Sequence, residues 1–576
     1  MYSVECNMKV LVINLTRMGD LIQTIGLINA VHKLLPKARI DVLVMKAFAS
    51  IVKHFEYVND VIAFDDSVFN ESIADDLWSS FGELYKIIDE LNKKEYDILF
   101  NPIVSKQSSI LAYLIKAKQK LGLQITENKE QKMTCDFTSY MLANQHSLGD
   151  FSFNLVDIFA GMIKDVECNK GRELLLPEYD EFRLRVFEGD LKSVGWFLNK
   201  VKLPPNERMI IGFHIGASQS NKAWNMGYYK TVIKELLIDR EYIVVLFGGY
   251  KEKEFKSFFA DVTSDLFFNT IGDFKVNELI AAVSSIDLLV TNDTGPMHIA
   301  TACGVPVIDI SLGPVSKWET GAYNENALII EARLDCHPCS FNNDCQHWNC
   351  HHAIQPEVVV EAVRYKMQAL RSQKYENKDG LPHFVRNDKV SFSYYDKVRF
   401  YTCGKDMFGF HSFKPLFKEE ITKIEYVFLL KRFVWSLYFV DKWDDFGELK
   451  EQFMESIKAS YDVPNFCFKE LQNYLSELNG LILHILSDLE KVKNSEKSLD
   501  NNKEILLNVK RNKELLFSKA KEFELIYDWF WFFLFKESEI DDYEIDLIIM
   551  QTTRLYIKLK MKLVAFIDLL NMSKEK

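Results

Sequence analysis

The feature that most constrains this chain is a strand–helix alternation that starts at residue 9 and starts again at residue 209. In the first series, the buried-strand pattern of residues 9–14 (KVLVIN) is followed by a turn and an apolar-periodic helix, which Pro36 ends. Further strands are predicted at residues 39–44, 61–64 and 96–100, with a helix at 81–92. This order predicts a doubly wound parallel sheet.

The second series follows a charged helical stretch and a break at Pro204-Pro205. Its predicted strands are residues 209–214, 242–247, 288–291 and 305–310, and its predicted helices are 228–238, 276–284 and 297–303. Two Rossmann-like units in one chain predict an α/β fold with a cleft between the units. Ligands of such sheets bind at the carboxyl ends of the strands, so both loop sets should face this cleft.

A third segment begins where the composition changes, near residue 372. A short stretch rich in aromatic and β-branched residues (390–402) precedes a long helical region at about 418–570. Apolar stripes and charged faces in this region predict a helical bundle or a module for homo-oligomers. Because 576 residues exceed what one core usually holds, we expect three domains, at residues 1–200, 201–372 and 373–576.

The charge and the apolar runs restrict the partners of the chain. A formal net charge of −12 argues against a nucleic-acid partner held by a basic surface. The N-terminal residues contain one short predicted strand and no signal-peptide cleavage pattern, so we expect a cytoplasmic protein. The most apolar later stretches, 427–440 and 526–535, are too short or too interrupted by charge to span a bilayer, which leaves at most peripheral membrane contact.

The turn after the first predicted strand contains a candidate catalytic acid, Asp20. It lies one residue into the following helix, where its carboxylate can project into the cleft and accept a proton as a general base. The alternative is that Asp20 caps this helix. In the same turn, Gly19 permits a tight backbone and is predicted beside the donor, and Arg17 is predicted to contact an anionic acceptor.

A second turn, at residues 291–296 (TNDTGP), places a strand end, capping side chains and a proline before a helix. Backbone N–H groups at a helix N-terminus bind anions, so this turn is a candidate diphosphate site. The residues expected to line the diphosphate and sugar are Asp293, Thr294, Gly295 and His298. For Asp293, helix capping is the alternative to sugar contact.

Two other loops of the second unit complete the predicted donor site. Lys222 can reach a phosphate as a point charge and Ser218 can donate a hydrogen bond, although a surface lysine without a role is the alternative. Gly249 and Glu252 follow the strand at 242–247, where an acid can bind ribose hydroxyls.

Four cysteines in the second unit have the spacing C-x2-C-x5-C-x4-C within residues 336–350: Cys336, Cys339, Cys345 and Cys350. Four thiolates suit a structural zinc or iron ion, whereas four unliganded thiols are the alternative. Such a closed site leaves no open position for chemistry, and the sequence shows no acid-rich motif for a catalytic cation. We therefore expect no cofactor for catalysis.

The quoted motifs resemble glycosyltransferase family 9, the heptosyltransferase family. The resemblance covers roughly residues 8–370 and rests on TRMGDLIQT (16–24), HIGASQSNKAW (214–224), NDTGPMHIATACGVPVI (292–308) and CHPCSFNNDCQHWNC with IQPE (336–357). It implies a GT-B fold and an inverting, metal-independent transfer of heptose from ADP-heptose, with Asp20 as the base and Lys222 on the phosphate. It also implies that some relatives bind iron in a comparable cysteine finger, and that the chain is bacterial and works at or near the inner membrane.

The chain departs from the family pattern at Gly26, where relatives usually carry proline, and in the loop at 217–221, where relatives often carry threonines and acids. The implied acceptor is either the lipopolysaccharide inner core or a protein hydroxyl. We favour a protein acceptor at this stage, because the cysteine finger and the extension of about 200 residues exceed a minimal core transferase. The rival functions are a non-catalytic nucleotide-sugar-binding or assembly protein and a nucleotide-sugar epimerase.

Overall fold

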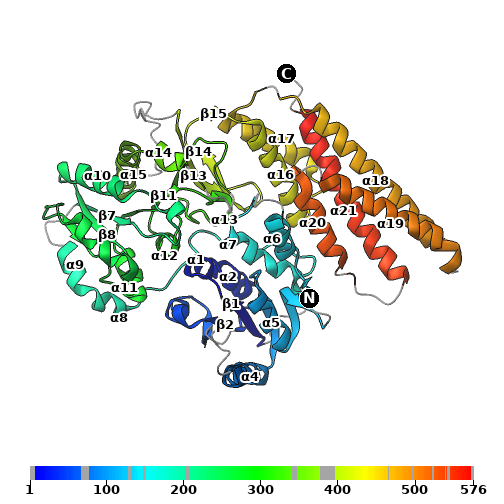
Figure 1. Cartoon of the computed structure of the whole chain (residues 1–576), viewed down its shortest axis with the longest axis horizontal. Coiled ribbons are helices and arrows are strands. Elements are labelled where there is room, and N and C mark those ends of the chain that lie inside the picture. Colours follow the sequence, from blue (N-terminus) through cyan, green and yellow to red (C-terminus); the bar gives the residue numbers. More distant parts are fainter. Residues whose placement is uncertain are drawn as a thin grey trace.

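A computed structural model describes residues 7–572, apart from 66–76, 128–130, 147–150, 202–207, 340–344, 346, 377–395, 465, 495–498, 522–523, 539 and 541–544. The described residues form two large sheets with covering helices and a group of long helices to one side (Figure 1). We call the sheet that contains β1 (Lys9–Asn14), with its helices, the first lobe. The sheet that contains β7 (Met209–His214), with its helices, is the second lobe.

The first lobe has six strands in the order β3-β2-β1-β4-β5-β6, and all pairs except β5–β6 are parallel. The strands predicted at 9–14, 39–44, 61–64 and 96–100 are confirmed. The sheet also contains two strands that the sequence did not predict, at 117–125 and 131–133. Besides β1, the strands of the first lobe are β2 (Arg39–Met45), β3 (Val58–Phe64), β4 (Tyr96–Asn101), β5 (Ala117–Ile125) and β6 (Gln131–Met133). Its principal helices are α1 (Met18–Gln23), α2 (Ile25–Leu34), α4 (Leu77–Lys93), α5 (Lys106–Leu114), α6 (Asp136–His146) and α7 (Leu155–Gly161).

The second lobe has eight strands in the order β14-β13-β12-β11-β10-β7-β8-β9, parallel from β12 to β9. Strands β7, β8 (Tyr242–Phe247) and β10 (Leu288–Thr291) are buried along their whole length, as their continuous apolar runs predict for strands covered on both faces. The other parallel strands are β9 (Phe267–Asn269), β11 (Val307–Ser311) and β12 (Leu328–Ala332). The principal helices are α10 (Met226–Ile238), α11 (Val276–Val283), α12 (Gly295–Ala302), α13 (Lys317–Thr320), α14 (Asn349–Ala353) and α15 (Pro356–Glu376).

The segment after residue 372 begins by extending the second sheet. β13 (Val398–Lys405) pairs antiparallel with β12, and β14 (His411–Pro415) pairs antiparallel with β13. Six helices follow: α16 (Lys423–Val440), α17 (Phe446–Ser460), α18 (Lys469–Asn494), α19 (Leu499–Lys521), α20 (Glu524–Ser538) and α21 (Ile545–Met572). The predicted helical region is confirmed, whereas its role in oligomers stays a prediction.

The helical region also packs on the first lobe, where α20 lies beside α6 (Figure 1). The Phe439 ring of α16 stacks on Phe137 of α6 at 4.0 Å between centroids. Asp136, at the start of α6, forms an ion pair of 2.8 Å with Lys536 and accepts a hydrogen bond from the Tyr438 hydroxyl. The extension is therefore attached to both lobes, by strands on one side and by helices on the other.

No helix within the described ranges is both long enough and apolar enough to cross a membrane.

Candidate active site between the two lobes

The turn that carries Asp20 is fixed by a buried asparagine. The Asn14 side-chain amide donates hydrogen bonds to the Asp20 carbonyl oxygen at 3.3 Å and to the Thr24 hydroxyl at 2.6 Å. The N-cap residue of α1 is Arg17, and Asp20 lies three residues further on, in the first turn. Asp20 therefore does not occupy the capping position that was the alternative to a catalytic role.

Asp20 faces the second lobe. Burial raises the pKa of its carboxyl, the charge of His298 lowers it, and Asp293 raises it further. Arg17 and Lys222 add smaller lowering effects. The groups that act on Asp20 thus come mainly from the opposite lobe, so this carboxyl faces the second sheet and its helices.

Two glycines let the lobes approach each other at this point. A Cβ atom at Gly19 would lie 2.9 Å from Cδ2 of His298, and one at Gly295 would lie 2.0 Å from Cε of Met18. A side chain at Gly19 would clash with the His298 ring, and one at Gly295 would displace the end of the Met18 side chain. The two glycines therefore permit the close approach of α1 and α12, a role that the sequence motifs alone did not indicate.

Asp293 and His298 form a buried pair at the start of α12. Asp293 Oδ1 lies 3.5 Å from His298 Nε2, and Asp293 Oδ2 accepts a hydrogen bond of 2.5 Å from the Thr320 hydroxyl. Burial acts to raise the pKa of Asp293, but His298, Lys222 and Thr320 together lower it. Asp293 is therefore ionised. The N-cap of α12 is Thr294, so the capping alternative for Asp293 is not observed.

A further carboxyl, Glu319 on α13, belongs to the same group although the sequence did not indicate it. Its side chain keeps some solvent contact, but protein atoms enclose the carboxyl. This burial, with the charges of Asp20 and Asp293, raises the pKa of Glu319 to about 8 against the opposing effect of Lys222. We call Asp20, Lys222, Asp293, His298 and Glu319 the inter-lobe site.

Polar side chains also line the strand ends behind Lys222. The register aligns Thr291 of β10 with His214 of β7 on one side and with Asp309 of β11 on the other. Both carboxyl oxygens of Asp309 and Nδ1 of His214 are buried without a hydrogen-bond partner in the described residues. Burial lowers the pKa of His214 to about 4 and raises that of Asp309 well above its usual value. His214 is therefore neutral at pH 7, and both groups are candidate ligand contacts that the apolar strand patterns hid.

Glu252 lies beside the loop that carries Lys222. Glu252 is in the first turn of the 3-10 helix η7 (Tyr250–Phe259), and its backbone N–H donates a hydrogen bond to the Gly249 carbonyl oxygen. A Cβ atom at Gly216 or at Gly249 would lie 3.0 Å from its carboxyl oxygens. Because glycine has no Cβ atom, Gly216 and Gly249 leave room for the Glu252 carboxyl. Ser218 is exposed on the same loop.

The four cysteines are brought together next to the Lys222 loop. Burial raises the pKa of the Cys339 thiol, and the charges of Cys350, Cys345 and Cys336 raise it further. Cys345 Sγ lies 3.7 Å from Nδ1 of His347. Within the described residues, no group of three or more histidine, cysteine or acidic side chains is arranged to hold a metal ion, so the metal stays a prediction.

Residues around the cysteines support the backbone of the donor loops. The His351 side chain donates from Nε2 to the Asn221 carbonyl oxygen at 3.0 Å, next to Lys222. His337 Nε2 donates to the Ser311 carbonyl oxygen at 3.0 Å, and the Cys339 N–H donates to that of Gly313 at 3.1 Å. The finger thus determines where the Lys222 loop and the end of β11 lie.

Two facing Rossmann-like lobes with a carboxyl on one and a cation beside a helix N-terminus on the other define a GT-B glycosyltransferase. The family described as glycosyltransferase family 9 (heptosyltransferase) matches residues 84–348. The chain is 23% identical over 339 residues to lipooligosaccharide heptosyltransferase 2 of Campylobacter jejuni, an alignment that covers 56% of this chain and 94% of that protein. It is 26% identical over 374 residues to lipopolysaccharide heptosyltransferase 2 of Escherichia coli K12, covering 64% of this chain and 99% of that one.

A solved family 9 glycosyltransferase from Veillonella parvula has the same fold, with a TM-score of 0.50 and 19% identity over 63% of this chain and 98% of its own. Over its two lobes the chain is therefore similar to glycosyltransferase family 9. It is therefore a glycosyltransferase, and it carries a large segment beyond the length shared with these relatives.

Proposed function

We propose that this chain transfers heptose from ADP-heptose to a hydroxyl of a lipopolysaccharide inner-core saccharide, with inversion at the anomeric carbon. The observation that carries the proposal is the position of Asp20 on the first lobe, opposite Lys222 and His298 on the second. The family description and the names of the relatives support heptose as the sugar. ADP as its carrier follows from the motif resemblance.

In the proposed reaction, Asp20 accepts the proton of the acceptor hydroxyl while its oxygen attacks the anomeric carbon. The bond from that carbon to the diphosphate oxygen breaks, and ADP departs with the electron pair. The raised pKa of Asp20 brings this base closer to the working pH, which favours proton transfer. Asp293 orients His298 through their contact of 3.5 Å.

The departing diphosphate needs positive charge, which the second lobe supplies. Lys222 acts on the carboxyls that line the site, and α12 begins beside Asp293 with the N–H groups of its first turn. Glu252, beside the Lys222 loop, is positioned to bind ribose hydroxyls. The proposal requires no divalent cation, so EDTA should leave the rate of transfer unchanged.

The relatives favour a saccharide acceptor over the protein acceptor that the size of the extension first suggested. Both curated relatives described above are named for lipopolysaccharide or lipooligosaccharide. A protein hydroxyl is the second candidate, and the cysteine finger and the extension are the features that favour it. Supplying ADP-heptose with a truncated inner-core saccharide or with bacterial protein extract distinguishes them by which one becomes labelled.

The central test is Asp20→Asn in the full-length protein. Removing a general base should lower kcat for sugar transfer by about 10²- to 10⁴-fold, while ADP still raises the melting temperature. Asp261→Asn is a matched control, because Asp261 is exposed and pairs only with surface lysines in the described structure. This control should transfer sugar at the wild-type rate.

Three results would count against the proposal. Full activity of Asp20→Asn would remove Asp20 from the mechanism. Release of an epimerised nucleotide sugar without an acceptor would identify an epimerase. Binding of ADP-heptose without turnover on any acceptor would identify a binding or assembly protein.

We also propose a structural zinc or iron ion at Cys336, Cys339, Cys345 and Cys350. Burial and, to a smaller extent, the charges of the other three thiols raise the pKa of Cys339, and a bound cation would relieve the second effect. Elemental analysis should find about one metal per chain, and Cys350→Ser should lose it. Retention of the metal by this variant, or its absence from wild-type protein, would refute the site.

A further inference from the structure

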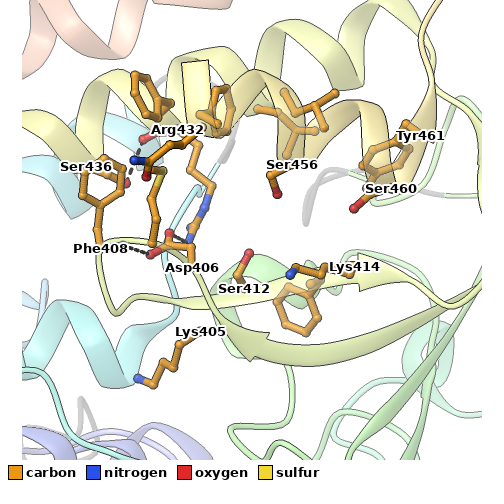
Figure 2. Close-up of a pocket in the computed structure, with 17 residues that line it drawn as sticks. Lys405, Asp406, Phe408, Ser412, Lys414, Arg432, Ser436, Ser456, Ser460 and Tyr461 are labelled. Atoms are coloured by element: carbon orange, nitrogen blue, oxygen red, sulfur yellow. Dashed lines mark hydrogen bonds and ion pairs between the residues drawn. The ribbon is translucent and has the colours of Figure 1, made fainter. Parts of the chain in front are cut away.

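A cavity lies outside the inter-lobe site, between the β13–β14 hairpin and helices α16 and α17. Its volume is about 330 Å³, which is within the range of small-ligand pockets. It opens beside strands that belong to the second sheet and is roofed by helices of the extension (Figure 2). Neither the motifs nor the proposed reaction uses it.

One side of this cavity is aromatic. Three phenyl rings line it, and two of them, Phe433 and Phe453, stack with centroids 4.4 Å apart. The third ring, Phe408, packs on Phe433 at 5.5 Å between centroids, whereas the ring of Phe413 on β14 packs on Trp318. Such rings offer flat apolar surface to a ligand that has one apolar face.

The other side presents hydroxyls and a cation that protein groups do not use. Figure 2 shows Ser412 and Lys414 of β14 facing Ser456 and Ser460 of α17 across the same space. Within the described residues, none of these three hydroxyls hydrogen-bonds to protein and Lys414 pairs with no acid. These groups converge from two different elements and are available to a ligand.

The charges around the cavity favour an anionic ligand. Arg432 and Asp406 neutralise each other through an ion pair of 2.7 Å. Lys405 points away and donates to the Pro177 carbonyl oxygen at 2.9 Å. Lys414 therefore remains as the positive charge that faces the space.

We propose that this cavity binds a carboxylated sugar residue and serves as an accessory saccharide site. The C–H face of a pyranose ring packs on the phenyl rings, its hydroxyls bond to the serines, and its carboxylate pairs with Lys414. Its use in holding an acidic residue of the acceptor rests on the proposed function.

The cavity is also connected to the inter-lobe site through one side chain. The Trp318 ring lies 5.1 Å from the Phe413 ring and 4.8 Å from the Arg432 guanidinium. Its neighbour in α13 is Glu319, which belongs to the inter-lobe site. Trp318 therefore packs against two residues that line the cavity and is the chain neighbour of a carboxyl of the inter-lobe site.

Binding is tested directly on the full-length protein by ligand-observed NMR titration with three probes: glucuronate, glucose and acetate. Glucuronate should bind more tightly than glucose, which lacks the charge, and than acetate, which lacks the ring. Lys414→Ala should weaken glucuronate about tenfold, the size of one charge-assisted hydrogen bond. Ser456→Phe should fill the cavity and abolish binding.

Lys458→Ala is the matched control, because Lys458 is exposed on α17 and does not line the cavity. It should bind glucuronate as the wild type does. The proposal is overturned if Lys414→Ala also binds like the wild type, if glucose or acetate equals glucuronate, if no probe binds, or if ADP displaces glucuronate.

Sugar transfer gives a second measurement. Lys414→Ala should raise KM for an acidic acceptor about tenfold and leave KM for the donor and kcat unchanged. An unchanged acceptor KM would show that the cavity does not serve the acceptor. If no acceptor is glycosylated by wild-type protein, the proposed function fails, whereas the glucuronate titration still decides the cavity.

Discussion

The inter-lobe site and the core of the helical extension both bury charged groups, but with opposite surroundings. Between the lobes, Asp20, Asp293 and Glu319 share the cation Lys222, and Asp20 and Glu319 keep some contact with solvent. In the extension, Lys431 and Asp528 form an ion pair of 2.8 Å with almost no exposed surface. The contrast teaches that a buried charge indicates function here only where a ligand can reach it.

Lys562 is the clearest case of a buried ionisable group that no ligand can reach. It is fully buried, with Nζ 3.0 Å from the centroid of the Trp435 ring and 4.1 Å from that of Tyr438. Its amine has no hydrogen-bond partner among the described residues, and burial lowers its pKa well below the usual value. No substrate can reach it, so we assign it to folding and not to catalysis.

Among the substitutions that test this comparison, the largest change in stability is expected at Asp528. Its carboxylate pairs with Lys431 and accepts a hydrogen bond of 3.1 Å from the Trp435 indole. Asp528→Ala leaves a buried ammonium unpaired, so the free energy of unfolding should fall by about 3–5 kcal/mol. Denaturant titration measures this loss, and kcat of the folded fraction should not change. A variant that is stable but inactive would contradict the assignment.

A smaller effect of the opposite sign is expected at Lys562. Lys562→Met keeps the volume and removes a buried amine without a partner, so the free energy of unfolding should rise by about 1–3 kcal/mol. Because the folded pKa of Lys562 is lowered, the unfolded chain binds more protons, and wild-type stability rises with pH up to the unfolded pKa. Denaturant titrations at pH 7 and pH 9 should show a weaker rise for the variant. An unchanged pH dependence would show that Lys562 is charged in the fold.

The smallest expected effect concerns the inter-lobe site and is a change in KM for the donor that depends on Glu319. Its carboxyl is neutral below a pKa of about 8 and becomes an anion as the pH rises through that value. The new charge faces Asp20, Asp293 and Lys222 and repels the donor diphosphate, so KM for the donor should rise about tenfold by pH 9. Glu319→Gln should remove this rise, as steady-state kinetics from pH 6.5 to 9 would show. A rise that persists in the variant would assign it to another group.

Much of the fold follows from local sequence. Runs such as residues 9–14 and 242–247 predict their strands because strands covered on both faces are continuously apolar. The pairing of β13 with β12 could not be predicted, since it joins residues about 70 positions apart across a segment of mixed pattern. Residues 117–125 form a strand although lysines interrupt the apolar pattern that predicts the other strands.

The sequence predicted the site residues that lie in recognisable motifs. It missed those that only the packing of the fold brings to the site. Asp20, Lys222, Asp293 and His298 lie in recognisable turns, and the structure brings them together. Glu319 lies on a four-residue helix without a periodic signal. At Gly26, where relatives carry proline, a Cβ atom would lie 2.7 Å from the Val156 carbonyl oxygen. The glycine therefore serves close helix packing, which the sequence could not show.

The attachment of the extension to both lobes has a mechanical consequence. Strand β13 is hydrogen-bonded to the second sheet, while Phe439 and Lys536 hold the first lobe through Phe137 and Asp136. Rotating one lobe against the other must shear these contacts or bend the helices that carry them. If the lobes move as substrates enter and products leave, we expect the rate to depend on the stiffness of a segment that supplies no atom to the bond being made.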